Sequence, residues 1–300
     1  MIKMEKLAVD PRIMRLAMGL SRYTPERIGH HLSWRMASAV SRLKPAVYRV
    51  VQSNLGPLLG TIENSSVLDQ MARKVLYIAI RGYYDLFRAL RLSMEEMAAL
   101  VDLPDETRAI ARAAWGRDKG TVVVFPHLGN FDLGGHAIMP LLPEMQLLTL
   151  PDPPPGFQLL NSSRQRGGVR VTPLSTNALR DAIKLLRRGG VVSIAADRPI
   201  SELDEPFFFF GRPARVPSGH VRLALRTGAS VVIGYCVLSP ETQRYVMRLE
   251  PPMEMIRTGN REEELQLNMR RVLDALEGII RAWPEQWQMF VPVWPELLTA

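Results

Sequence analysis

From residue 120 onward, short β-branched runs alternate with amphipathic segments, and this alternation constrains the fold more than any other feature. We expect strands at 121–125, 145–150, 168–172, 190–196, 206–210, 230–238 and 244–250. We expect helices at 130–141, 157–166, 175–188, 217–227 and 261–282. Such alternation predicts an α/β sandwich with a mostly parallel central sheet flanked by helices.

The residues before this region are predicted to be helical. Apolar residues recur at helical spacing in 11–22, 25–43, 66–92, 94–101 and 105–115, and another helix should run from Pro45 to Gly56-Pro57. Segment 11–22 has an apolar stripe with arginines outside it. This pattern is typical of a helix that lies in a membrane interface, and it also fits a helix that packs on the rest of the fold. The chain should therefore divide into a membrane-facing helical section, 1–115, and an α/β domain, 116–300.

Composition narrows the classes of partner and site. The 300 residues carry a net charge of +8, which favours an anionic partner such as nucleic acid, a membrane surface or a phosphorylated substrate. No apolar run reaches the roughly 18 residues of a transmembrane helix, and the N-terminus lacks the apolar core of a cleaved signal peptide. With one cysteine and five histidines, we expect no disulfide framework and no metal centre.

The segment FPHLGNFDLGG at 125–135 carries the strongest indication of chemistry. A buried strand should end at Phe125, a short loop carries His127, and Asn130 should cap the next helix. Loops at the carboxyl ends of strands are where α/β sheets place their sites, and a histidine there can take a proton near neutral pH. Asp132 could fold back to hold the ring of His127. It could also simply complement the helix dipole beside an ordinary loop histidine.

The form HLGNFD at 127–132 resembles the signature of the glycerolipid and lysophospholipid acyltransferases, above all the branch of bacterial lipid A biosynthesis and phosphatidylinositol mannoside acyltransferases. Further motifs follow in the order of that branch: Asn161-Ser-Ser-Arg164, Ala195-Ala-Asp197-Arg198, Phe209-Phe210-Gly211, Pro217-Ser-Gly219, the segment 223–229 and Pro284-Glu-Gln-Trp287. The similarity covers nearly the whole chain. Arg198 departs from the pattern, because glutamine is common there, and this leaves the acceptor open.

The resemblance implies transfer of a fatty acyl group from a thioester to a hydroxyl of a membrane glycolipid or lysophospholipid. It implies His127 as general base for direct attack and Asp132 as the residue that orients it. Arg164, or the amides near Gly129 and Asn130, would stabilise the oxyanion. Substrate contacts are expected from Asn130, Arg164, Asp197, Arg198 and Gly211, and acyl-chain contacts from Phe131, Phe209 and Phe210. Asp197 could also be a simple turn residue or the partner of Arg198.

The same resemblance implies partners and a location. The co-substrate would be acyl carrier protein or coenzyme A thioester, with no separate cofactor. The enzyme would bind anionic lipids peripherally or monotopically at the cytoplasmic face of the inner membrane, with positive charge on the N-terminal helices and around Arg212–Arg226. Nucleic acid is not expected, because no aromatic-interleaved basic motif or zinc-finger spacing occurs.

Two alternatives remain open from the sequence. A thioesterase or lipase could use the same His–Asp pair to activate water, although the Gly-x-Ser-x-Gly nucleophile elbow is missing. A non-catalytic peripheral membrane-binding protein could rely on the charge and the amphipathic helix alone.

Overall fold

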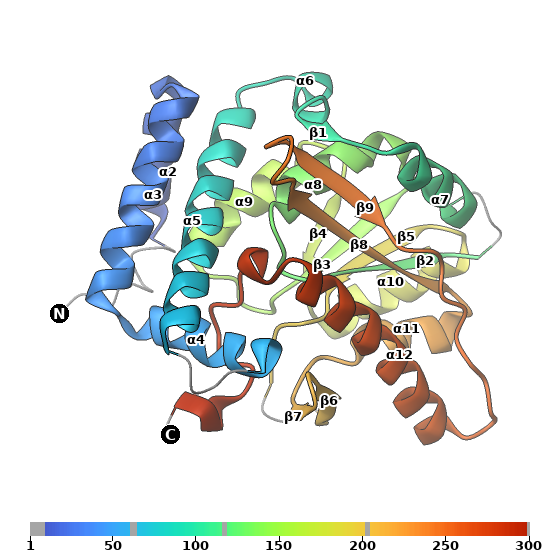
Figure 1. Cartoon of the computed structure of the whole chain (residues 1–300). Helices are drawn as coiled ribbons and strands as arrows, with labels where there is room; N and C mark the ends of the chain where they lie inside the picture. Colours follow the sequence, from blue (N-terminus) through green and yellow to red (C-terminus); the bar gives the residue numbers. More distant parts are fainter. Residues whose placement is uncertain (1–9, 61–64, 116–118, 202–204, 299–300) are drawn as a thin grey trace.

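The computed structural model describes residues 10–60, 65–115, 119–201 and 205–298. Within this part of the chain one central sheet has the strand order β1-β9-β8-β2-β5-β3-β4 (Figure 1). Its strands are β1 (Val101–Asp102), β2 (Thr121–Phe125), β3 (Met145–Thr149), β4 (Arg170–Pro173), β5 (Val191–Ala195), β8 (Ser230–Leu238) and β9 (Tyr245–Leu249). All neighbours pair in parallel except β8 and β9, so the predicted mostly parallel α/β fold is confirmed.

Helices cover both faces of this sheet. On one face lie α10 (Thr176–Arg187), α11 (Gly219–Thr227) and α12 (Arg261–Ala282), which bury the inward residues of β2, β5 and β8 in the main core. On the other face α7 (Asp105–Trp115) and α8 (Phe131–Ile138) pack against β8 and β9, and α9 (Pro155–Gln165) packs beside α8 and β4. The layers therefore enclose two apolar clusters, one on each side of the sheet.

The N-terminal section is helical, as expected, and lies beside the sheet at the left of Figure 1. It contains α2 (Pro11–Tyr23), α3 (Glu26–Leu43), α4 (Ala46–Leu59), α5 (Ser65–Ala89) and α6 (Met94–Ala98). Helix α5 packs against α2, α3, α4 and the short 3-10 turn Pro284–Gln286. In the described residues, no helix combines the length and the apolar character needed to span a membrane.

Two predicted helix ends are wrong. Helix α4 continues through Pro57 and ends at Gly60, which has φ +63°. Burial of Leu58 and anchoring of the Asn54 side chain on the carbonyls of Met289 and Val291 outweigh the lost backbone hydrogen bond. The expected helix 94–101 stops at Ala98, because residues 101–102 pair with β9 as an edge strand.

The predicted strand 206–210 lies outside the central sheet. β6 (Phe207–Phe209) pairs with β7 (Arg212–Ala214) in a separate antiparallel hairpin. Phe210 and Gly211 form its two-residue turn with φ of 50° and 73°, the geometry that suits the twist of a tight hairpin. Gly211 is therefore explained by the turn.

The register between β2 and β5 fixes what lies at the sheet's carboxyl edge. Phe125, the last residue of β2, is opposite Ala195, the last residue of β5. His127 and Asp197 each follow two residues later, so two parallel strands deliver them side by side.

The loop after His127 is held by hydrogen bonds to two segments that are distant in the sequence. The amide of Gly129 donates to the Gln286 carbonyl at 2.9 Å, and the amide of Asn130 donates to the Cys236 carbonyl at 3.0 Å. Gly129 has φ +57°, and a Cβ there would lie 2.1 Å from the carbonyl oxygen of Cys236. Only glycine fits this position without moving the loop that carries His127.

Replacing Gly129 with alanine should therefore destabilise the fold by about 1–3 kcal/mol or more, since both the left-handed backbone and the close approach to β8 oppose a side chain. Thermal and urea denaturation measure the change. Gly278→Ala is the matched control, because Gly278 lies in α12 with open space around its Cα and should gain stability slightly. Equal Tm values for the two variants would contradict the loop geometry.

Candidate active site

The ring of His127 is held by a carboxylate that has no access to solvent. Nδ1 lies 2.7 Å from Oδ1 of Asp197, and the backbone amide of His127 donates to Oδ2 at 2.8 Å. Trp287 donates its indole N–H to the same Oδ2 at 2.9 Å. Asp197 itself is fully buried.

These contacts affect the protonation of Asp197 and the tautomer of His127. Burial alone would raise the pKa of Asp197, but the attraction of His127 and the hydrogen bonds from His127 and Trp287 lower it below its ordinary value. An ionised carboxylate can only accept hydrogen bonds, so Nδ1 of His127 donates to it, and in the tautomer that this contact selects the lone pair lies on Nε2. Nε2 makes no hydrogen bond with a described residue, and the side chain is 20% exposed.

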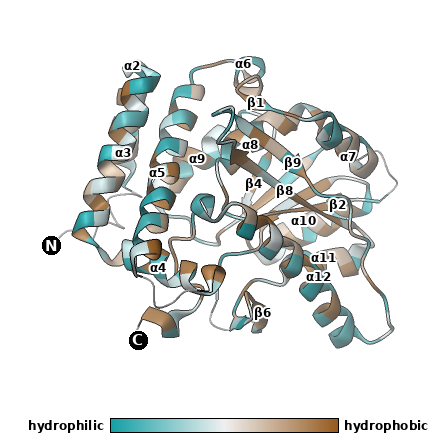
Figure 2. Cartoon of the chain, viewed as in Figure 1, coloured by the Kyte–Doolittle hydropathy of each residue, from teal (hydrophilic) through white to brown (hydrophobic). Residues whose placement is uncertain are grey.

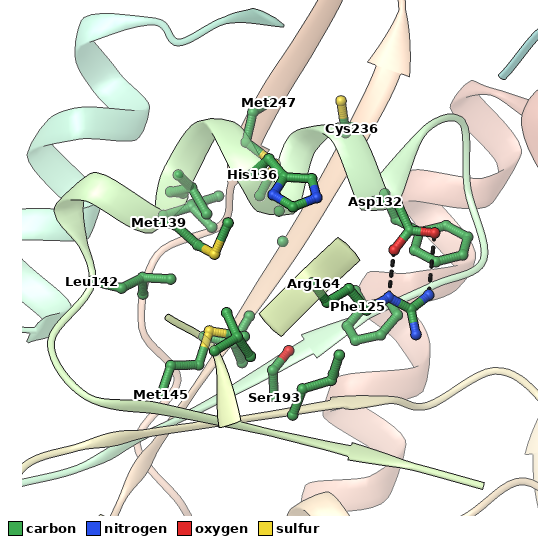
Figure 3. Close-up of a pocket in the computed structure, with 18 of the residues that line it drawn as sticks. Phe125, Asp132, His136, Met139, Leu142, Met145, Arg164, Ser193, Cys236 and Met247 are labelled. Atoms are coloured by element: carbon green, nitrogen blue, oxygen red, sulfur yellow. Dashed lines mark hydrogen bonds and ion pairs between the residues drawn. The ribbon is translucent and has the colours of Figure 1, made fainter. Parts of the chain in front are cut away.

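The expectation that Asp132 orients His127 is wrong. Both oxygens of Asp132 accept from Arg164, from Nε at 2.6 Å and from Nη2 at 3.1 Å (Figure 3). Arg164 also donates to Asn161, three residues earlier on α9, at 2.8 Å. The first turn of α8 thus directs Asp132 toward α9.

Arg164 keeps its charge although its side chain is largely buried beside Asp132. Burial disfavours the guanidinium charge of Arg164, but the attraction of Asp132 and its hydrogen bonds outweigh this and raise the pKa of Arg164. A bidentate arginine–carboxylate pair fixes the orientation of both side chains. The two acidic residues at this edge therefore serve different partners: Asp197 holds His127, and Asp132 holds Arg164.

Asn130 caps α8, as the sequence predicts. Its Oδ1 accepts from the amide of Leu133 at 3.2 Å, and its Nδ2 donates to the carbonyl of Gly82 in α5 at 3.0 Å. These contacts explain the buried side chain without a substrate. The backbone amides of Gly129 and Asn130, two of the candidate oxyanion donors, are already bonded to the carbonyls of Gln286 and Cys236, so these two are not free to serve.

Within the described part of the chain, Arg198 differs from Arg164 in having no fixed partner. It follows Asp197 directly, is partly exposed, and makes no hydrogen bond or ion pair with any described residue. Burial lowers the pKa of Arg198, while Asp197 and Tyr83 act against this. Its guanidinium is available to an anionic group at the site.

A cavity extends from this edge between α8 and the sheet (Figure 3). Phe125, Phe131, Asp132 and Arg164 line the end nearest the histidine, and the ring of Phe131 lies 5.6 Å from that of His127. The rest of the lining is mainly apolar and includes Met139, Leu142, Met145, Leu147, Val169, Met247 and Leu249. About 90 Å³ of the cavity is open to the centres of water molecules, room for several of them.

The aromatic residues expected to line an acyl groove separate into two groups. Phe131 lines the cavity. Phe209 and Phe210 do not, because they are buried against Trp287 and Trp294 beneath the site. Those two residues support the indole that donates to Asp197.

Comparison with known proteins agrees with the family that the motifs suggest. The model of the bacterial lipid A biosynthesis acyltransferase family matches residues 13–296. The chain is similar to two phosphatidylinositol mannoside acyltransferases of Mycobacterium tuberculosis, from strains CDC 1551 / Oshkosh and ATCC 25618 / H37Rv. Identity to each is 24% over 253 residues, which cover 81% of this chain and 76% of the relative.

A third relative extends the comparison. The phosphatidylinositol mannoside acyltransferase of Mycolicibacterium smegmatis (strain ATCC 700084 / mc(2)155) is 23% identical over 249 residues, covering 81% of this chain and 78% of the relative. The family match spans the helical section and the α/β domain alike, including the His127 loop, the Asp132–Arg164 pair and the segment of Trp287. The chain belongs to the bacterial lipid A biosynthesis acyltransferase family and is an O-acyltransferase.

Proposed function

We propose that the protein transfers a fatty acyl group from a thioester, carried by coenzyme A or acyl carrier protein, to a hydroxyl of a membrane glycolipid. The observation that carries this proposal is the His127–Asp197 pair, in which Nδ1 is bonded to a buried carboxylate and Nε2 is left free. A sugar hydroxyl is a poor nucleophile, so a positioned base is worth about 10²–10⁴-fold in rate.

In the proposed reaction, Nε2 of His127 accepts the proton of the acceptor hydroxyl while its oxygen attacks the thioester carbonyl. The tetrahedral intermediate collapses as the C–S bond breaks, and the imidazolium returns the proton to the departing thiolate. The products are an ester and a free thiol. Asp197 keeps the ring in the required tautomer and stabilises the imidazolium that forms.

The cavity beside Phe131 suits the acyl chain of the donor. Its walls are mainly apolar, and its near end is formed by Phe125 and Phe131, whose rings stack at 5.6 Å. A chain in this cavity would bring its thioester to the mouth, beside His127. Burying a fatty chain there is favourable by about 25 cal/mol per Å² of apolar surface removed from water.

The partly exposed guanidinium of Arg198 suits an anionic group of either substrate. Thioesters of coenzyme A and of acyl carrier protein both carry phosphate, and so do phosphoinositide glycolipids, the class named for the relatives. An arginine binds phosphate through two parallel hydrogen bonds. We therefore assign Arg198 to phosphate binding and the fixed Asp132–Arg164 pair to shaping the mouth.

Replacing either member of the His127–Asp197 pair should abolish most of the acyl transfer. We expect His127→Ala and Asp197→Asn to lower kcat by about 10²–10⁴-fold, because one lacks the base and the other loses the tautomer. The assay supplies purified protein with acyl-CoA or acyl carrier protein thioester and vesicles containing phosphatidylinositol mannoside or a lipid A precursor. Asp274→Asn, at a half-exposed position on α12 away from the site, is the control. Full activity of Asp197→Asn would rule out the proposed dyad.

The ion pair at the mouth should behave as one unit. Asp132→Asn and Arg164→Gln each remove the same interaction, so the double variant should lose little more activity than either single variant. Steady-state kinetics on all three variants give the coupling. Additive losses would show that the two residues act independently.

The outer surface of α3 supports a membrane location. Its buried stripe consists of the small residues Gly29, Ser33 and Ala37, which let it approach α5 so closely that a Cβ on Gly29 would enter the ring of Tyr84. Its large apolar residues face outward instead. Exposed apolar residues of α2 and α3 are Ile13, Leu16, Leu20, Tyr23, Ile28, Leu32, Trp34, Met36 and Leu43.

Arginines accompany this exposed apolar surface, namely Arg12, Arg15, Arg22, Arg27, Arg35 and Arg42. An apolar helix face bordered by basic residues inserts into the headgroup region of anionic membranes. Figure 2 shows brown and teal residues interleaved along α2 and α3. We therefore place these helices against the cytoplasmic surface of the membrane that holds the acceptor.

Replacing Leu16 and Leu20 with serine should weaken vesicle binding several-fold without unfolding the protein, because both side chains are exposed. Cosedimentation with anionic and neutral vesicles measures the effect, and added salt should weaken binding to the anionic ones. Ile256→Ser, an exposed apolar residue in the α/β domain, is the matched control and should bind as wild type. Unchanged binding of the α2 variant would contradict this placement.

A further inference from the structure

Beyond the Asp132–Arg164 pair, the polar side chains of His136 and Ser193 interrupt the apolar lining of the cavity. His136 lies on α8, which forms one wall, and Ser193 lies on β5 in the sheet that forms the other (Figure 3). Both residues are almost fully buried, at 2% and 3% exposure. An acyl chain without substituents would need neither of them.

Neither side chain has a hydrogen-bond partner among the residues that the structure describes. Both ring nitrogens of His136 are buried without a hydrogen bond. The Ser193 side chain lines the cavity and makes no hydrogen bond with a described residue. Buried polar groups are nearly always hydrogen-bonded, and leaving one unpaired is costly. This pairing requirement points to a partner that enters the cavity from outside.

The ligand chemistry follows from the groups present. Burial lowers the pKa of His136, with Asp132 acting against this and Arg164 adding to it, so the imidazole is neutral. A neutral imidazole offers one donor and one acceptor, and the serine hydroxyl offers both as well. A hydroxyl group matches both residues, whereas a charged group would be costly to bury in this lining.

The two residues line the cavity farther from the sheet's carboxyl edge than Asp132 and Asp197. His136 follows Asp132 by one helical turn, about 6 Å along α8 at 1.5 Å per residue. Ser193 precedes Asp197 by four residues, about 13 Å along the strand direction at 3.3 Å per residue. Met139 and Met247 line the same cavity, and their flexible side chains can shift to open the ring nitrogens of His136.

We propose that this cavity selects acyl chains that carry a hydroxyl group on an internal carbon, which Ser193 and His136 bind. The inference rests on the proposed function, because it assigns the substituent on the donor's acyl chain. It makes the two residues determinants of chain specificity, with no part in the proton transfer at His127.

The experiment compares acyl-CoA thioesters of one chain length, with no hydroxyl or with a hydroxyl at carbon 2, at carbon 3 or further along. Binding is measured by calorimetry without acceptor, and transfer is measured in competition with mass-spectrometric detection of products. We expect one hydroxylated isomer to bind wild-type protein about three- to tenfold more tightly than the plain chain, as one or two net hydrogen bonds allow.

Variants separate a specific site from general packing. Ser193→Ala, nearly isosteric, and His136→Phe should each remove most of the preference for the hydroxylated chain. Leu142→Ala, another lining residue, should weaken both chains alike. Trp115→Phe removes a third unpaired lining donor, the indole N–H on α7, and should leave the preference intact.

The possible results distinguish a failure of this inference from a failure of the proposed function. If every hydroxylated isomer binds no better than the plain chain while transfer proceeds, the inference is wrong and the proposed function stands. A preference that survives Ser193→Ala and His136→Phe, or that only Trp115→Phe removes, also overturns it. If no acyl-CoA binds and nothing is transferred from acyl carrier protein either, the proposed function falls and this inference with it.

Discussion

The carboxylate of Asp197 has no contact with solvent and depends on the donors that surround it. His127 supplies two of them, from its ring and its amide, and Trp287 supplies a third. Three segments distant in the chain meet at this one group: the end of β2, the end of β5 and the C-terminal segment. Because a buried, unpaired carboxylate is expensive, each segment holds the others in place.

The surroundings of this carboxylate are organised to keep the contact dry. Phe209 and Phe210 pack under Trp287, and the amide of Gln288 donates to the carbonyl of His127 at 2.7 Å. The β6–β7 hairpin, whose aromatic run suggested an acyl groove, thus supports the site from beneath. The fixed position of the His127 ring therefore depends on packing around Trp287, by residues that lie outside the reaction site.

The same geometry gives the two carboxylates different partners. Asp197 is enclosed and bonded to the histidine, whereas Asp132 lines the cavity and binds a buried arginine. The Asp132–Arg164 pair lines the apolar cavity, and the ring of Phe131, which also lines it, lies 5.6 Å from that of His127. The proposed membrane contact rests on a separate feature, the large apolar residues that α3 exposes on its outer face.

The fold class and part of the site could be predicted from the sequence. Alternating hydrophobic periods determined the α/β fold, because buried strands and amphipathic helices leave different repeats. Local motifs determined His127, the Asn130 cap and the Asn161–Arg164 block, since each acts within a few residues. Only the tertiary structure decided which acid serves His127. Asp197 stands 70 residues away, and its position depends on β5 pairing with β2, a choice of strand order that local spacing does not encode. The tertiary structure alone also decided which of the aromatic residues line the cavity, because burial depends on what packs from across the sheet.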